Sequence, residues 1–218
     1  MDSKLNSLLK WSTENSSSDP SSAPAKPIDP AALSALFGGP SDADLMKMSM
    51  AAILSSDPEI TLEDKLVAFD NFEQLIENLD NANNIEALAL WPSLLGTLSD
   101  PAPDIRTMAA WCIGTAIQNN AKAQERCLAH GGIPLLVRLA RAEAEEVVVR
   151  RKAVYALSSA CRNYQPAMDV LVGELRGEEV EGMELGEKVD AADMGVCDGI
   201  FGALRDAATN CRVVGKNA

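Results

Sequence analysis

Two matching segments decide the fold: AAWCIGTAIQN at residues 109–119 and AVYALSSACRN at residues 153–163. Aligned at a shift of 44 residues, they pair Trp111 with Tyr155 and also match aliphatic, hydroxyl and amide positions further along. Each contains three alanines and lacks the strict polar–apolar alternation of a half-buried strand, so each is predicted to be a helix. The chain therefore contains an internal repeat of helices.

The repeat continues toward the N-terminus. WPSLLGTL at residues 91–98 matches IPLLVRLA at residues 133–140 at a shift of 42, and KLVAFDNFEQLIEN at residues 65–78 is a weaker copy at a shift of about 41. Periods in the low forties are typical of armadillo or HEAT-type repeats, in which each small group of helices packs on the next. We therefore predict an all-α fold, an armadillo-like right-handed helical solenoid of about three to four repeats with capping helices.

Capping residues suggest where several helices begin. Asp42 or Ser41 can start a helix that runs to about Leu54. Thr61, followed three positions later by an aspartate, can start another that runs to about Leu79. A last helix is predicted over roughly residues 190–208, after a glycine-rich and acidic loop.

The two ends of the chain differ from the repeats. Residues 3–11 can form a short amphipathic helix, whereas residues 12–30 are rich in Ser, Pro, Ala and Asp and cannot bury enough apolar surface to become ordered. We predict a flexible N-terminal segment at 1–30, an armadillo-like helical repeat domain at 31–208 and a frayed tail at 209–218. The apolar residues of the N-terminal segment are either incidental or partner contacts: Leu5, Leu8, Leu9 and Trp11.

A stripe of polar and aromatic side chains recurs on the repeated helices. In repeats of this period, the last and longest helix usually lines the concave face. The predicted partner-binding residues of that face, at equivalent offsets in three copies, are Trp111, Thr115, Gln118, Asn119, Tyr155, Ser159, Arg162, Asn163, Asp70, Gln74 and Glu77. Alternatively, the two aromatic residues pack between repeats, and the two asparagines cap helix ends.

Charge limits the kinds of partner. The net charge of −13 comes from 32 acidic and 19 basic residues, and it opposes binding to nucleic acid and to anionic lipid. Residues 101–165 nevertheless hold nine Lys or Arg against five Asp or Glu. A cationic belt in an acidic protein favours an acidic protein surface as partner, although at least half of these charges are expected on solvated helix faces.

No catalytic or metal-binding pattern stands out. The single histidine, His130, lies in AHGGIP, a turn between helices, and without it neither a Ser–His–Asp nor a Cys–His arrangement can be built. The five cysteines include no C-x-x-C pair, and Cys112 and Cys161 are expected to pack as small hydrophobes. We therefore expect no enzymatic activity, no cofactor and no metal.

No apolar run approaches the roughly 20 residues of a membrane span, and no secretory signal is evident, so we expect a cytoplasmic protein.

Several long stretches resemble a known family: GGPSDADLMK (38–47), KLVAFDNFEQLIENLDNANN (65–84), MAAWCIGTAIQNNAKAQER (108–126) and VRRKAVYALSSACRNYQPAMD (149–169). They are similar to the fungal armadillo-type nucleotide exchange factors of 70-kDa heat-shock chaperones, which are relatives of the animal heat-shock-chaperone-binding protein. The resemblance extends from residue 1 to about residue 206, and the ending after Asp206 is unlike the family.

The resemblance implies a function that the repeat pattern alone does not. It implies that the concave face clamps the nucleotide-binding domain of a cytosolic 70-kDa chaperone, so that ADP leaves and the client is released. It also implies that residues 1–30 engage the chaperone's substrate-binding domain. We expect a monomer that binds neither nucleic acid nor membranes. The alternative is an armadillo-type adaptor or scaffold for another protein or peptide, although the Trp–Asn ladder of importin-like adaptors is missing, since Thr115 stands four residues after Trp111.

Overall fold

The computed structural model describes residues 38–176, 185–186 and 188–210. The chain divides into two compact units between Ser41 and Asp42, and the described helices belong to the second unit. Its described residues form helices and connecting turns, with no strand among them, which confirms the predicted all-α fold. None of these helices combines the length and the apolar character that a bilayer span requires.

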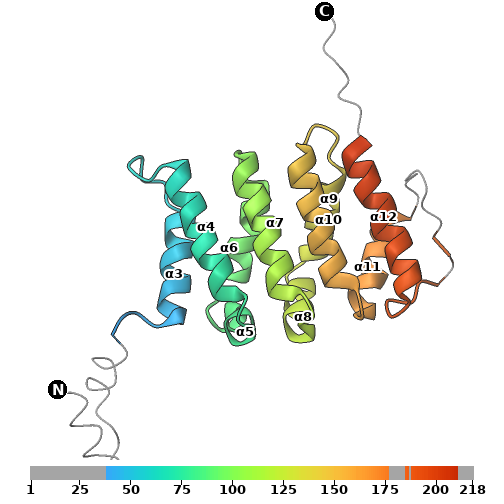
Figure 1. The fold of residues 1–218 in the computed structure, drawn as a ribbon, viewed down its shortest axis with the longest axis horizontal. Helices are drawn as coiled ribbons and strands as arrows, with labels where there is room; N and C mark the ends of the chain where they lie inside the picture. Colours follow the sequence, from blue (N-terminus) through green and yellow to red (C-terminus); the bar gives the residue numbers. More distant parts are fainter. Residues whose placement is uncertain (1–37, 177–184, 187, 211–218) are drawn as a thin grey trace, which may run out of the picture. The chain divides into compact units, whose positions relative to one another are not determined.

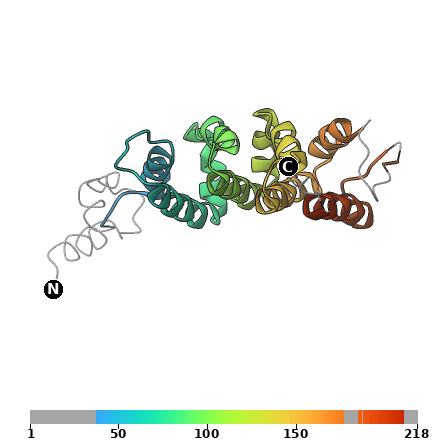
Figure 2. The same ribbon diagram turned by 90° about the horizontal axis from the view of Figure 1, so that it is seen from above.

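Long helices lie side by side in one layer, and shorter ones lie behind them (Figures 1 and 2). The front layer consists of α4 (Leu62–Ile76), α7 (Pro103–Ile117), α10 (Val147–Cys161) and α12 (Met194–Asn210). The remaining elements are α3 (Asp42–Ile53), α5 (Leu79–Ala87), α6 (Trp91–Gly96), the 3-10 turn η1 (Thr97–Ser99), α8 (Ala121–Ala129), α9 (Gly132–Arg141) and α11 (Gln165–Leu175). Within the front layer, α7 packs against α4 on one side and α10 on the other, and α12 packs against α10.

The start of α4 follows the predicted capping box. The Thr61 hydroxyl accepts a hydrogen bond from the Asp64 backbone N–H, and the Asp64 carboxylate accepts one from the Thr61 N–H at 2.9 Å. The helix ends at Ile76 rather than near Leu79, because Asn78 adopts an extended conformation and its side chain caps α5 by accepting from the Asp80 N–H at 2.9 Å. The predicted helix therefore corresponds to α4 with its end placed about three residues too late, and a second helix, α5, begins at Leu79.

A single hydrophobic cluster extends from Met46 in α3 to Ala208 in α12. Its bulkiest members are Trp91 and three buried phenylalanines, whereas α7 and α10 contribute many small buried side chains. The buried alanines of these two helices are Ala109, Ala110, Ala116, Ala153, Ala156 and Ala160. Small residues let two helices approach closely, and this accounts for a core that needs so few aromatic side chains.

Candidate partner-binding surface

The solvent-facing side of the four front-layer helices, hereafter the long-helix face, carries most of the predicted contact residues. Trp111 on α7 is the most prominent aromatic residue there, with 37% of its surface exposed. Lys152 of the neighbouring helix α10 places its Nζ 3.5 Å from the centroid of the indole ring. Trp111 is therefore a surface side chain that is held in place by a cation from the next helix.

Tyr155, the repeat equivalent of Trp111, packs between helices instead. Its ring is half-buried and lies against Gly114 of α7, where a Cβ atom would come within 2.4 Å of Tyr155 Cε1. Its hydroxyl donates a hydrogen bond to Gln118 Oε1 at 3.2 Å. The alternative of packing between repeats thus describes Tyr155, whereas Trp111 remains available for a partner.

Thr115 links α7 to the first copy of the repeat. Its hydroxyl donates to Glu73 Oε1 on α4 at 2.8 Å. Glu73 was not among the predicted contact residues, and a carboxylate at this position has no marker in the sequence apart from its helical spacing. The predicted residues of the first copy are all exposed on α4 or at its end: Asp70, Gln74 and Glu77.

Arg162 at the end of α10 is tied to α12 rather than free. Its guanidinium donates to Asp198 Oδ1 at 2.7 Å and to Ser158 Oγ at 2.9 Å, and it lies 5.4 Å from the buried Phe201 ring. Ser159 differs from its prediction, because only 9% of it is exposed and its backbone carbonyl accepts from Gln124 Nε2 at 2.8 Å. Ser159 is therefore buried rather than exposed on the long-helix face, and the neighbouring Ser158 is the more exposed of the two serines.

The two predicted asparagines end helices. Asn119 and Asn163 directly follow the C-caps of α7 and α10, and both have left-handed backbones, with φ of 53° and 57°. Asn tolerates this conformation better than most residues, which is why it recurs after helices. Both side chains are exposed. The structure thus supports the capping role and leaves partner contact by these two residues as a prediction.

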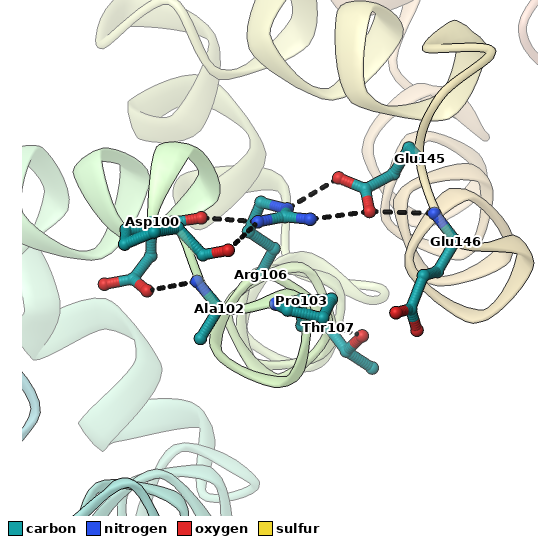
Figure 3. A network of polar contacts seen from close by, with 8 residues as sticks. Asp100, Ala102, Pro103, Arg106, Thr107, Glu145 and Glu146 are labelled. Carbon is teal, nitrogen blue, oxygen red and sulfur yellow. Dashed lines mark hydrogen bonds and ion pairs between the residues drawn. The ribbon is translucent and has the colours of Figure 1, made fainter.

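Several cations of the predicted belt serve the fold. Arg106 forms a two-pronged ion pair with Glu145, in which Nε lies 2.6 Å from Oε2 and Nη2 lies 2.7 Å from Oε1 (Figure 3). The same guanidinium donates to the backbone oxygens of Asp100 and Pro101. Arg150 is almost completely buried. The belt is therefore weaker at the surface than its composition predicts.

The Arg106–Glu145 pair joins the start of α7 to the loop before α10. The side chains are 17% and 8% exposed, so the pair is largely shielded from water. Burial by itself would raise the pKa of Glu145, but the hydrogen bonds from Arg106 and the Glu146 N–H, with the charges of Arg106 and Arg150, outweigh burial and lower it. Glu145 is held as a carboxylate.

A cavity of about 520 Å³ lies between α3 and α4. It is lined by Leu45, Met48, Ser49, Ala52, Ala68, Asn71, Gln74 and Leu75. Gln74 is both a predicted contact residue and part of the lining of this cavity, which lies at the α3–α4 end of the row of helices.

The predicted contacts of the N-terminal segment lie outside the described residues: Leu5, Leu8, Leu9 and Trp11.

The described cysteines are buried, and none is placed as a nucleophile. Burial raises the pKa of Cys127 to about 12 and also raises the pKa values of Cys112 and Cys161. Thiols of this kind pack as small hydrophobes.

The single histidine, His130, ends α8, and its Nε2 lies 2.9 Å from a carboxylate oxygen of Glu86. The next residue, Gly131, has a left-handed backbone conformation. No group of three His, Cys, Asp or Glu side chains suited to a metal occurs in the described part of the chain.

The described residues thus define an all-helical protein with an aromatic and charged face on its row of long helices. Residues 5–85 match the family model described as nucleotide exchange factor Fes1. Residues 81–177 match the model of the SIL1/FES1/HPBP1 C-terminal domain. Together the two models cover the first repeat copies, the long helices α4, α7 and α10, and α11 behind them.

Known relatives match almost end to end. The Hsp70 nucleotide exchange factor FES1 of Gibberella zeae is 57% identical over 212 residues, which cover 94% of this chain and 97% of the relative. The Hsp70 nucleotide exchange factor fes-1 of Neurospora crassa is 50% identical, with 95% and 99% covered, and FES1 of Coccidioides immitis is 49% identical, with 94% and 99% covered. This chain belongs to the Fes1 family, which confirms the resemblance found in the sequence.

Proposed function

We propose that this protein is a nucleotide exchange factor, a co-chaperone that promotes ADP release from a 70-kDa heat-shock chaperone and thereby client release. The observation that carries the proposal is the 57% identity to the Gibberella zeae Hsp70 nucleotide exchange factor over 97% of that protein's length. The relatives from Neurospora crassa and Coccidioides immitis are likewise named Hsp70 nucleotide exchange factors. A partner-binding role also agrees with the exposed Trp111 and the charged side chains around it.

The fold that we infer is an armadillo-like right-handed solenoid of about three to four repeats. Equivalent positions of α7 and α10 are 44 residues apart, and those of α4 and α7 are about 41 apart. These spacings fall within the period of armadillo-type units. In this proposal the repeats occupy residues 31–208, α12 closes the far end of the stack, and residues 209–218 form a tail.

The long-helix face is proposed to clamp the nucleotide-binding domain of the chaperone. A factor that accelerates ADP loss must bind better to a domain conformation that holds ADP poorly. ADP must then weaken the factor's own binding to the same degree, because coupling between two ligands is reciprocal. A hundredfold faster release requires about 2.7 kcal/mol of differential stabilisation. A few well-placed interface residues can supply that amount.

The factor is proposed to act in the cytoplasm, as a monomer and without chemistry of its own. Its described cysteines are free thiols, which suits a reducing compartment. The N-terminal residues 1–30 are proposed to contact the substrate-binding domain of the chaperone through their leucines and Trp11, which would assist client release.

The test is the release of a fluorescent ADP from a cytosolic 70-kDa chaperone, followed after rapid mixing with excess ATP. Addition of this protein at micromolar concentration is expected to increase the release rate at least tenfold over the chaperone alone. Calorimetric titrations with and without ADP should show the reciprocal loss of affinity. An unchanged release rate would exclude the exchange-factor proposal, whatever the binding affinity.

A further inference from the structure

The cations on the long-helix face are not equivalent. Arg162 is occupied by Asp198 and Ser158, and Arg106 by Glu145. Lys152 is different, because no ion pair or hydrogen bond involves its ammonium group among the described residues. Its neighbour Arg151 is exposed. The middle of the row therefore presents a cation that is stacked on an aromatic ring and forms no ion pair with a described residue.

The Trp111 ring fixes where that cation stands. Lys152 Nζ lies 3.5 Å from the Trp111 centroid and 5.7 Å from the Tyr155 centroid, so the long side chain is drawn across from α10 toward α7. Tyr155 is itself held by Gly114 and Gln118. A lysine that is already ordered loses less side-chain entropy when a partner binds it.

The ammonium group of Lys152 is partly buried, and Glu73 supplies a negative charge near it. Burial lowers the pKa of Lys152, and the negative charge of Glu73 opposes this effect only in part. The carboxylate of Glu73 is itself engaged by the Thr115 hydroxyl. A further carboxylate that reached Lys152 from the solvent side would form the direct ion pair that Lys152 does not make with any described residue.

We propose that Lys152, stacked on Trp111, is the point at which this surface binds an acidic side chain of the chaperone. The carboxylate pairs with Nζ, while the exposed part of the indole ring covers the methylene groups of the same side chain or of its neighbour. Charge complementarity favours an acidic group, since Lys152 and Arg151 are adjacent and neither forms an ion pair within the described residues, while Glu73 acts on Lys152 only through its charge. This inference rests on the proposed function and adds the chemistry of one contact to it.

The experiment compares substitutions that separate charge from shape. Lys152→Met keeps the length and the apolar stem but removes the charge, whereas Lys152→Arg keeps a cation that can stack on an indole. The matched control is Lys122→Met, which removes an exposed lysine from α8, outside the front layer. Dissociation constants of the full-length variants for a nucleotide-free 70-kDa chaperone are measured by calorimetry at low and at moderate salt.

Lys152→Met is expected to weaken binding at least tenfold, whereas Lys152→Arg stays within about threefold and Lys122→Met within about twofold of the wild type. The affinity of the wild type should fall with salt more steeply than that of Lys152→Met, because one charge pair is missing in the variant. Thermal melts of all variants accompany the binding data, and Lys152→Gln replaces Lys152→Met if the methionine variant melts lower.

Two negative results are distinguishable. If the wild type neither binds the chaperone nor accelerates ADP release, the proposed function is wrong. If the wild type does both and the uncharged Lys152 variants bind equally well with the same salt dependence, the proposed function stands and the acidic contact at Lys152 is wrong. Equal losses in Lys152→Met and Lys152→Arg would also overturn the proposal, because they would show that shape and not charge is recognised.

Discussion

Gly114 is the residue that lets the second and third long helices meet. It lies in the last turns of α7, and its missing side chain leaves the space that the Tyr155 ring fills. Glycine ordinarily weakens a helix interior by up to about 1 kcal/mol relative to alanine. Its presence here is explained by the close approach of the ring rather than by any need for an unusual backbone conformation.

Gly114→Ala is therefore expected to destabilise the protein by about 1–3 kcal/mol, because the new Cβ would overlap Tyr155 Cε1 and Cδ1. Urea unfolding measures the loss. The matched control is Gly173→Ala in α11, where a Cβ meets nothing within 4 Å, so that the gain in helix propensity should raise stability. In a Tyr155→Ala background the cost of Gly114→Ala should disappear; a cost that persists there would mean that the ring is not its cause.

At the residue scale, the sequence singled out Trp111 as a surface candidate, but it did not predict that Lys152 stacks on the Trp111 ring. Trp111 and Lys152 are 41 positions apart and belong to different copies of the repeat, so only packing brings them together. Ser159 was misplaced by one position, since a spacing of four residues drifts around a helix and here turns toward the core. Partner contact by Arg162 stays a prediction, and its contact with Asp198 of α12 has no signal in the spacing of its own helix.

At the element scale, the Arg106–Glu145 pair connects consecutive units. Its guanidinium also holds two backbone oxygens of the η1–α7 connection, so a single side chain joins three segments (Figure 3). Planar guanidinium groups are suited to such forked contacts. Removal of one partner would leave the other largely buried without a counter-charge.

Glu145→Gln is expected to lower the free energy of unfolding at pH 7 by about 1–3 kcal/mol. The folded protein lowers the pKa of Glu145 below 4.5, so the stabilisation is present above that pH and is lost as the pH falls through the folded-state value. Stability measured by urea unfolding should therefore fall less steeply below pH 4.5 in the variant than in the wild type. Glu143→Gln, at an exposed site in the same loop, is the control and should change stability by less than about 0.5 kcal/mol. Parallel pH profiles of Glu145→Gln and wild type would contradict a lowered pKa.

Helices that carry a local signal were predicted well. The starts of α3 and α4 agree with their capping residues within one position. The end of α4 was placed too late, because the spacing of apolar residues continues past Ile76. That spacing does not show that Asn78 is the N-cap of a second helix. The last helix begins at Met194 rather than near residue 190, after a turn in which Ala191 is bonded to Asn163 and Gln165. Long-range contacts of that kind leave no local pattern.

At the scale of the molecule, the repeat period was sufficient to predict an all-helical chain, since each copy must bury its apolar face on the next. The family followed from long matching segments. The surface charge was predicted less well, because composition counts a buried Arg150 and a paired Arg106 as equal to an available Lys152. Burial and pairing depend on tertiary contacts and decide which charges a partner meets.

Deletion of residues 1–30 is expected to leave both the thermal melt and the acceleration of ADP release close to those of the full chain. The unit that begins at Asp42 contains a hydrophobic cluster that extends from Met46 to Ala208. Release of a fluorescent client peptide should become slower if the N-terminal segment has the proposed role. A melt lowered by more than a few degrees would show instead that these residues stabilise the helical unit.

The buried cysteines have a consequence for how the row of helices comes apart. Cys112, Cys127, Cys161 and Cys197 lie in four different helices, and each is shielded from solvent. A buried thiol with a raised pKa reacts with an alkylating reagent only after its helix has opened. The order in which the four are modified under native conditions therefore records which parts of the row loosen first. The protein carries its own chemical reporters of local opening, distributed from α7 to α12.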